Sequence, residues 1–162
     1  MAWAKLSSVT VGATPVDLID SGVITSTNFI QTLAFGVPSV PPSNTYIDLS
    51  IRPNNNANQV YSFKRRTNSG EYSNTVNQSD IDSWANETQC FQVCYYANIT
   101  GEEKLVMKWE LAPETNNANY RPNRQHIIGK SADTTDITSI RLVNTYSGDY
   151  ISGSNLSVIG TD

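Results

Sequence analysis

The chain has 162 residues, a length that fits one domain with a hydrophobic core of its own. Its net charge is -4 and only 16% of its residues are charged. This balance argues against a nucleic-acid partner, because phosphate binding needs a basic surface. No stretch reaches the roughly 18 apolar residues that a membrane-spanning helix needs. We therefore expect neither nucleic acid nor membrane as a partner.

Uncharged polar residues take the place of the missing charges. Asn, Ser and Thr make up 51 of the 162 residues. Ser and Thr are tolerated in strands and Asn favours turns, whereas none of the three is a strong helix former. The composition predicts an all-β protein with many loops and no long helix.

Alternation of apolar and polar residues with period two recurs along the chain and predicts about nine or ten strands. In chain order they are expected at residues 3–11, 16–19, 29–37, 46–51, 60–66, 89–97, 104–111, 125–128, 136–144 and 151–160. An Asn-rich turn joins 46–51 to 60–66, which predicts a hairpin. The polar stretch 67–83 is expected to be the longest surface loop.

The alternation also predicts which side chains are buried. In the strand 104–111, Leu105, Met107, Trp109 and Leu111 share one face, and we expect this face to point inward. Lys104, Val106, Lys108 and Glu110 would then face solvent. By the same argument the core would contain Phe29, Leu33, Phe35, Ile47, Leu49, Ile51, Phe91, Val93, Leu105, Met107, Trp109, Ile140, Leu142, Leu156 and Val158.

The last two predicted strands are joined by a turn that contains Gly148, and they are interpreted as a hairpin that ends the chain. A chain that ends on a strand usually ends inside a sheet, so we expect this terminus to be held in place. Two packed antiparallel sheets are the simplest way to bury so many strands. The predicted fold is one antiparallel β-sandwich of jelly-roll type over residues 1–162.

The residues that carry chemistry in other proteins are sparse. Cys90 and Cys94 would lie about 13 Å apart on one strand, too far for a disulfide, so we expect two buried free thiols. His126 is the only histidine and lies in no recognised catalytic motif. The sequence predicts no enzyme, no bound metal and no cofactor, although an irregular calcium site around Asp80 and Asp82 stays open.

Loop aromatics and carboxylates leave two further functions open. Tyrosines in or near predicted loops would suit contacts with a glycan or a protein partner, and the candidates are Tyr72, Tyr96, Tyr120, Tyr146 and Tyr150. Tyr95 is an alternative to Tyr96 on the same strand. Carboxylates in or near the long loop would suit a small polysaccharide-degrading enzyme, and they are Glu71, Asp80, Asp82 and Glu87.

The order of features resembles a known group of proteins. An N-terminal strand holds Trp3 and Leu6-Ser7-Ser8-Val9, and the chain ends with Ile137-Thr138-Ser139-Ile140-Arg141-Leu142 and then Gly153-Ser154 and Gly160. This resembles small β-sandwich structural proteins of tailed bacteriophages, often marine ones. Many of them end in the pattern I-x-S-I-x-L … G-x-x-x-x-G-S-x-x-x-L-x-G. This chain departs from that group at Asn155 and at Ile159, where an aromatic residue is common.

The resemblance implies a non-enzymatic virion protein, such as a capsid decoration, a head or tail fibre subunit or a tail component. Its partners would be its own copies and other virion proteins such as the capsid. A carbohydrate-binding module that recognises a host surface glycan is the alternative. The N-terminus lacks the apolar segment of a signal peptide, so we expect synthesis in the host cytoplasm and a final location in the virion.

Overall fold

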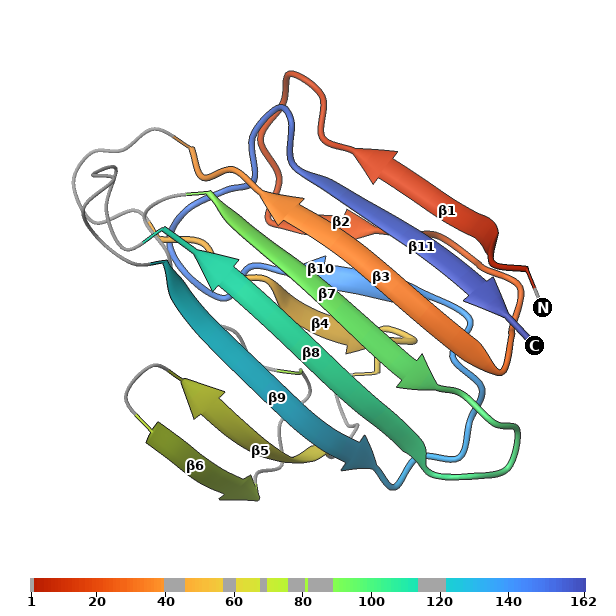
Figure 1. Cartoon of the computed structure of the whole chain (residues 1–162). Coiled ribbons are helices and arrows are strands. Elements are labelled where there is room, and N and C mark those ends of the chain that lie inside the picture. Colours follow the sequence, from red (N-terminus) through yellow and green to blue (C-terminus); the bar gives the residue numbers. More distant parts are fainter. Residues whose placement is uncertain are drawn as a thin grey trace.

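The computed structural model describes residues 2–39, 46–56, 61–67, 70–75, 81, 89–113 and 122–162. Its strands form two antiparallel sheets (Figure 1). The large sheet has eight strands in the order β1 (Ala4–Thr10), β11 (Asn155–Thr161), β3 (Phe29–Gly36), β7 (Cys90–Ala97), β8 (Lys104–Ala112), β9 (Asn123–Ser131), β5 (Tyr61–Thr67) and β6 (Gly70–Thr75). The small sheet has the order β2 (Leu18–Asp20), β10 (Ile140–Val143) and β4 (Ser50–Pro53).

Successive strands near both ends of the chain alternate between the sheets, whereas β5 to β9 all lie in the large sheet. Strands β1 and β3 belong to the large sheet and β2 and β4 to the small one, and β10 and β11 are divided in the same way. This alternation is typical of a jelly roll, and the predicted β-sandwich is confirmed. Nowhere in the described ranges does a helix have the length and apolar character needed to cross a membrane.

The same alternation shows that both predicted hairpins are wrong. Strand β4 lies in the small sheet and β5 in the large one, so they cannot pair. Strands β10 and β11 are likewise in different sheets, and the chain from Val143 to Asn155 passes from one layer to the other. A further strand, β6, pairs with β5 inside the stretch that was expected to be a loop. Its polar sequence carries no alternation that would have predicted it.

The C-terminal strand is held in place, as predicted. Strand β11 lies between β1 and β3 and forms hydrogen-bonded ladders with both (Figure 1). The backbone at Gly153 has φ +96°, a conformation that favours glycine. Next to it, the buried Ser154 hydroxyl accepts a hydrogen bond from Val37 N at 2.9 Å and donates one to Val37 O at 3.2 Å. Gly153 and Ser154 therefore stabilise the contact between the start of β11 and the residue that follows β3.

The core lies between the two sheets. The small sheet and its flanking segments contribute the fully buried Ile47, Leu49, Ile51, Ile140 and Leu142, and β11 contributes Leu156 and Val158. These seven predicted core residues are confirmed. Cys90 and Cys94 are buried free thiols, which is also confirmed. The large sheet adds buried residues that were not predicted, among them Ile30, Ala34, Tyr96, Val106 and Ile127.

The remaining eight predicted core residues point the other way. Phe29, Phe91, Leu105, Met107 and Trp109 are exposed, and Leu33, Phe35 and Val93 are only partly buried. On β8 it is Lys104, Val106, Lys108 and Glu110 that face the core, so the prediction for this strand is inverted. The alternation predicted correctly which residues share a face, but the more apolar face is the outer one.

Candidate functional site

The most unusual surface of the protein is the outer face of the large sheet, the face that points away from the small sheet. On β8 it carries Leu105, Trp109 and Leu111, whose side chains are 54%, 57% and 48% exposed, together with Met107. A soluble β-sandwich normally places polar residues on such a face. Four large apolar side chains in alternate positions therefore need an explanation beyond the fold of one chain.

The neighbouring strands continue this apolar surface. The register places Trp109 opposite Val93, and Val93 opposite Leu33, so that apolar side chains lie side by side across three strands. Together with the four residues of β8 we call these side chains the apolar outer face: Phe29, Leu33 and Phe35 on β3, and Phe91, Val93 and Tyr95 on β7. Ile128 on β9, which is 50% exposed, completes it.

The two sides of the apolar outer face differ in charge. On the side of β9 and β5 lie the exposed Lys64, Arg66 and Arg124, which we call the basic rim. Lys130 also lies there, but its Nζ is 2.6 Å from the Glu103 carboxylate.

On the side of β1 and β11 lie the uncharged side chains of Ser8, Thr10, Asn155 and Ser157, which we call the neutral rim, and one exposed charged residue, Lys5, which pairs with Ile159. The hydroxyl groups of Ser8 and Ser157 are 3.3 Å apart and hydrogen-bonded across the two strands. An apolar centre with polar margins is the usual anatomy of a protein–protein interface.

A hollow of about 390 Å³ lies where the apolar outer face meets the basic rim. Phe91, Trp109 and Leu111 form its apolar lining, and Arg66 and Arg124 contribute guanidinium groups. The imidazole of His126 meets the Trp109 indole edge to face, with ring centroids 5.5 Å apart. His126, the only histidine of the chain, is thus packed against an exposed aromatic ring on the outer face.

The inner face of β8 holds charged groups that the fold buries. Lys108 is fully buried, and its Nζ donates hydrogen bonds to Leu49 O at 3.1 Å and Ile81 O at 3.4 Å. The Glu110 carboxylate lies 3.2 Å from the same nitrogen. Buried charges are tolerated when they are paired and hydrogen-bonded, and these contacts meet that requirement. They explain how β8 can turn its lysines inward and its apolar residues outward.

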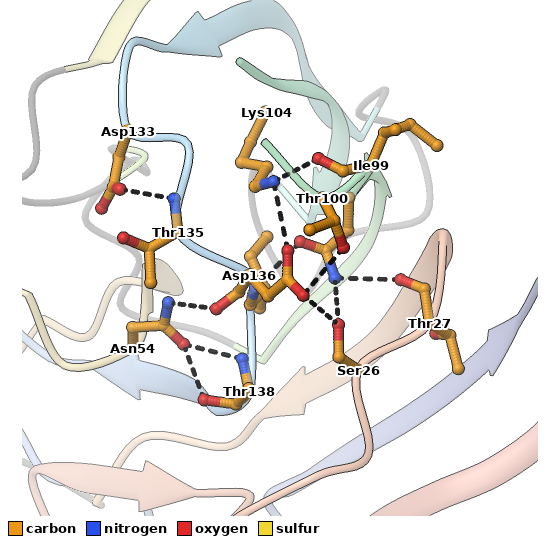
Figure 2. A network of polar contacts seen from close by, with 12 residues as sticks. Ser26, Thr27, Asn54, Ile99, Thr100, Lys104, Asp133, Thr135, Asp136 and Thr138 are labelled. Atoms are coloured by element: carbon orange, nitrogen blue, oxygen red, sulfur yellow. Dashed lines mark hydrogen bonds and ion pairs between the residues drawn. The ribbon is translucent and has the colours of Figure 1, made fainter. Parts of the chain in front are cut away.

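A second buried lysine, Lys104, belongs to the network of polar contacts drawn in Figure 2. Lys104 Nζ donates a hydrogen bond to Ile99 O and is 3.7 Å from the Asp136 carboxylate. The other oxygen of Asp136 accepts hydrogen bonds from the hydroxyl groups of Ser26 and Thr100. This network joins three loops at the end of the sheets, and all of its members have partners within the protein. We read it as a structural element that fixes these loops.

A buried carboxyl group and a carboxyl pair complete the set of unusual ionisable groups. Burial raises the pKa of Asp48, although hydrogen bonds from Ser50 and Thr145 oppose the shift. A hydrogen bond between the carboxyl groups of Asp17 and Asp149 raises the pKa of Asp17. Among the described residues, no three His, Cys, Asp or Glu side chains gather closely enough to hold a metal ion.

The structure corrects two of the five predicted contact tyrosines. Tyr96 and Tyr150 are buried, so neither can contact a glycan or a partner at the surface. Tyr96 follows the inward parity of β7, whereas its neighbour Tyr95 belongs to the apolar outer face. Tyr150 is enclosed because its hydroxyl donates a hydrogen bond to Asp48 O. The period-two alternation of the strand would have distinguished Tyr95 from Tyr96, because Tyr95 lies on the same face of β7 as Phe91 and Val93.

The other predicted site residues are not brought together. Tyr146 is 49% exposed and lies between β10 and β11, outside the strands of the large sheet. Tyr120 and the side chain of Tyr72 lie outside the described residues. The same holds for the side chain of Glu71 and for Asp80, Asp82 and Glu87, so the predictions of a loop carboxylate site and of a calcium site remain predictions.

Comparisons of this chain with protein families, curated proteins and solved structures gave no match. Its candidate function therefore rests on the chain's own residues and geometry.

Proposed function

We propose that this chain is a non-enzymatic structural subunit of a virus particle, a capsid decoration or a head or tail fibre subunit, which associates with its own copies. The apolar outer face is the observation that carries the proposal. Monomeric soluble proteins rarely expose contiguous apolar patches larger than a few hundred Å², and larger ones usually mark interaction sites. A subunit whose widest sheet is apolar on its outer face is suited to permanent assembly.

The energetic argument points the same way. Burying a large apolar side chain that was exposed contributes about 1.5–3 kcal/mol. Leu105, Trp109, Leu111 and Ile128 each keep about half of their surface in contact with water in the single chain. Several such side chains in one patch provide enough favourable free energy to offset the entropy that is lost on association.

The setting in a virion is supported by the resemblance to phage structural proteins, and the buried tyrosines favour assembly over the glycan alternative. Gly153 and Ser154, which carry part of that resemblance, are explained by the junction of β11 with β3. Both residues stabilise the fold of this chain and do not themselves form a contact surface. The capsid or tail partner would then be reached by an assembled unit.

Native mass spectrometry of the purified chain, combined with mass spectrometry of purified virus particles from its source, tests the proposal. We expect an oligomer of defined size and the presence of this chain in the particles in a fixed copy number. A chain that is monomeric at all concentrations and absent from particles would overturn it.

Carbohydrate binding is the second candidate, and the hollow beside Trp109 is the observation that favours it. An exposed indole can stack on a sugar ring, and Arg66 and Arg124 would favour an acidic sugar. A glycan array with the wild-type chain and with the Trp109→Ala variant tests this candidate. Binding of acidic glycans that is lost in the variant would support it, and no binding by the wild type would count against it.

A further inference from the structure

The outer face of the large sheet has the size of a stable protein–protein interface. Eight strands spaced about 4.8 Å apart, each about seven residues long at about 3.3 Å per residue, cover a plane of about 900 Å². A standard interface buries about 800 Å² on each partner. The apolar outer face occupies the middle strands, and the two rims occupy the sides. One whole sheet face can therefore serve as one interface.

A second copy of this chain is the occupant that fits this face best. Most homo-oligomers are built on two-fold axes, which place the same patch of both copies in contact. Two apolar outer faces then cover each other completely, and the paired sheets form the aligned packing that is common between β-sheets. A polar or charged partner would leave Trp109 and Leu105 against groups that prefer water.

The charges on the rims decide between two possible two-fold arrangements. If the axis runs across the strands, each strand crosses its own copy, and the basic rim meets the basic rim. Lys64, Arg66 and Arg124 would then face like charges, which is unfavourable at short range.

If the axis runs parallel to the strands, the β5 side of one copy lies over the β11 side of the other. Arg66 then lies over Ser157 and Lys64 over Ile159 on β11, and Arg124 lies over Phe35 on β3. The only charged residue in the strands on that side is Lys5 of β1, so fewer like charges face one another than in the first arrangement.

We propose that two copies pack face to face through their apolar outer faces, about a two-fold axis that runs parallel to the strands between β7 and β8. This arrangement rests on the proposed self-association. The register of the sheet gives the facing positions, because Ser157, Leu33, Val93, Trp109, His126 and Arg66 lie in one row across it. Val93 of one copy lies over Trp109 of the other, and Ser157 lies over Arg66.

Crosslinking between two different cysteine variants tests the arrangement. Ser157→Cys protein is mixed with isotopically heavy Arg66→Cys protein and treated with a short bismaleimide, and intact masses identify each product. The native thiols are poor competitors, because both are buried and burial raises the pKa of Cys90 and raises that of Cys94 to about 12. We expect the mixed dimer to be the main crosslinked product.

Controls separate this product from chance collisions and from the other arrangement. A Val23→Cys variant carries its thiol in an exposed loop outside the large sheet, and with Arg66→Cys it should give at least tenfold less mixed product. If Arg66→Cys crosslinks mainly to itself, the axis runs across the strands and the proposal is overturned. A mixed yield equal to that of the Val23→Cys control overturns it as well.

A charge at the centre of the face provides a second measurement. In native mass spectrometry, Trp109→Lys is expected to raise the dissociation constant of the dimer at least tenfold, and Leu105→Lys serves as a second variant. Both side chains are exposed in the single chain, so circular dichroism should show an unchanged fold. If the wild type never dimerises, the proposed self-association itself is overturned. If the wild type dimerises and both lysine variants dimerise equally well, only the face-to-face arrangement is overturned.

Discussion

Asp48 is a fully buried carboxyl group that ties two distant segments together. Its side chain accepts hydrogen bonds from the Ser50 hydroxyl at 2.6 Å, from Thr145 N at 2.8 Å and from the Thr145 hydroxyl at 2.9 Å. Its backbone carbonyl accepts a hydrogen bond from the Tyr150 hydroxyl. The turn between β10 and β11 is therefore anchored to the segment that leads into β4. Burial nevertheless makes the charged form of this carboxyl costly.

The raised pKa of Asp48 predicts how the stability of the fold changes with pH. The folded state holds the proton more tightly than the unfolded chain, so this group makes unfolding easier as the pH rises from the ordinary pKa of 3.8 through the raised value. Asp48→Asn removes this dependence and keeps the side chain's shape. We expect the wild type to lose stability relative to Asp48→Asn over that interval. Urea unfolding of both proteins between about pH 4 and pH 7 measures this difference, and a constant difference would contradict it.

Asn54 is a second residue whose side chain holds a loop. Its backbone has φ 54°, its Oδ1 accepts hydrogen bonds from Thr138 N at 2.8 Å and Ser139 N at 3.3 Å, and its Nδ2 donates one to Asp136 O. The contact with Asp136 O is drawn in Figure 2. These bonds fasten the end of β4 to the segment that precedes β10.

Asn54→Ala should destabilise the protein by about 1–3 kcal/mol more than Asn55→Ala, because only the first change leaves backbone groups without their partners. Asn55 is a matched control, since it has a similar backbone conformation, φ 50°, and no side-chain hydrogen bond within the described part of the chain. Chemical denaturation of both variants measures the difference. Equal losses of stability would show that the backbone conformation alone matters at these positions.

At the scale of the elements, β11 is the strand that closes the large sheet. It is hydrogen-bonded on both sides, to β1 and β3, and the space around Gly160 is small. A methyl group there would lie 2.3 Å from the Thr27 hydroxyl oxygen and 2.7 Å from a Leu6 methyl carbon. The close approach of the loop before β3 therefore depends on glycine at this position.

Gly160→Ala is expected to destabilise the fold by about 1–3 kcal/mol through overpacking. Gly12→Ala is the matched control, because a methyl group at Gly12 meets nothing within 4 Å. Its effect should lie near zero or be slightly stabilising, since alanine restricts the unfolded chain. Differential scanning calorimetry of the two variants compares them directly. A Gly160→Ala protein as stable as the wild type would show that Thr27 and Leu6 move aside freely.

The elements also show what the sequence could and could not predict. Period-two alternation located most strands, because a strand side chain must face one side or the other. It could not predict which side of β8 faces the core. In the structure Lys108 and Glu110 face the core, and Leu105 and Trp109 are exposed. That choice depends on the carbonyl groups of Leu49 and Ile81, which are distant in sequence and solvate the Lys108 ammonium. The candidate site was missed for the same reason, since its residues were assigned to the core.

At the scale of the whole molecule, the sandwich is asymmetric. Eight strands form one sheet and three form the other, and the small sheet lies against only one side of the large sheet (Figure 1). Within one chain, no described element covers the outer face. Association would complete the layering of the molecule, because each copy supplies the missing layer for the other.

Coupling between association and folding predicts that thermal stability depends on protein concentration. When a dimer dissociates on unfolding, its free energy of unfolding rises by about 1.4 kcal/mol for each tenfold rise in protein concentration. This gain in stability is divided between the two chains. For chains of this length the midpoint should rise by about 2 °C per tenfold step. Calorimetry or circular dichroism over a hundredfold range of protein concentration measures this for the wild type.

Two lysine variants serve as controls. Met107→Lys, at the centre of the apolar outer face, should abolish the concentration dependence, whereas Val23→Lys should keep it because its side chain lies in a loop outside the large sheet. A wild-type unfolding midpoint that stays constant with concentration would mean that the apolar outer face is not covered by a second copy. A different partner would then have to cover this face.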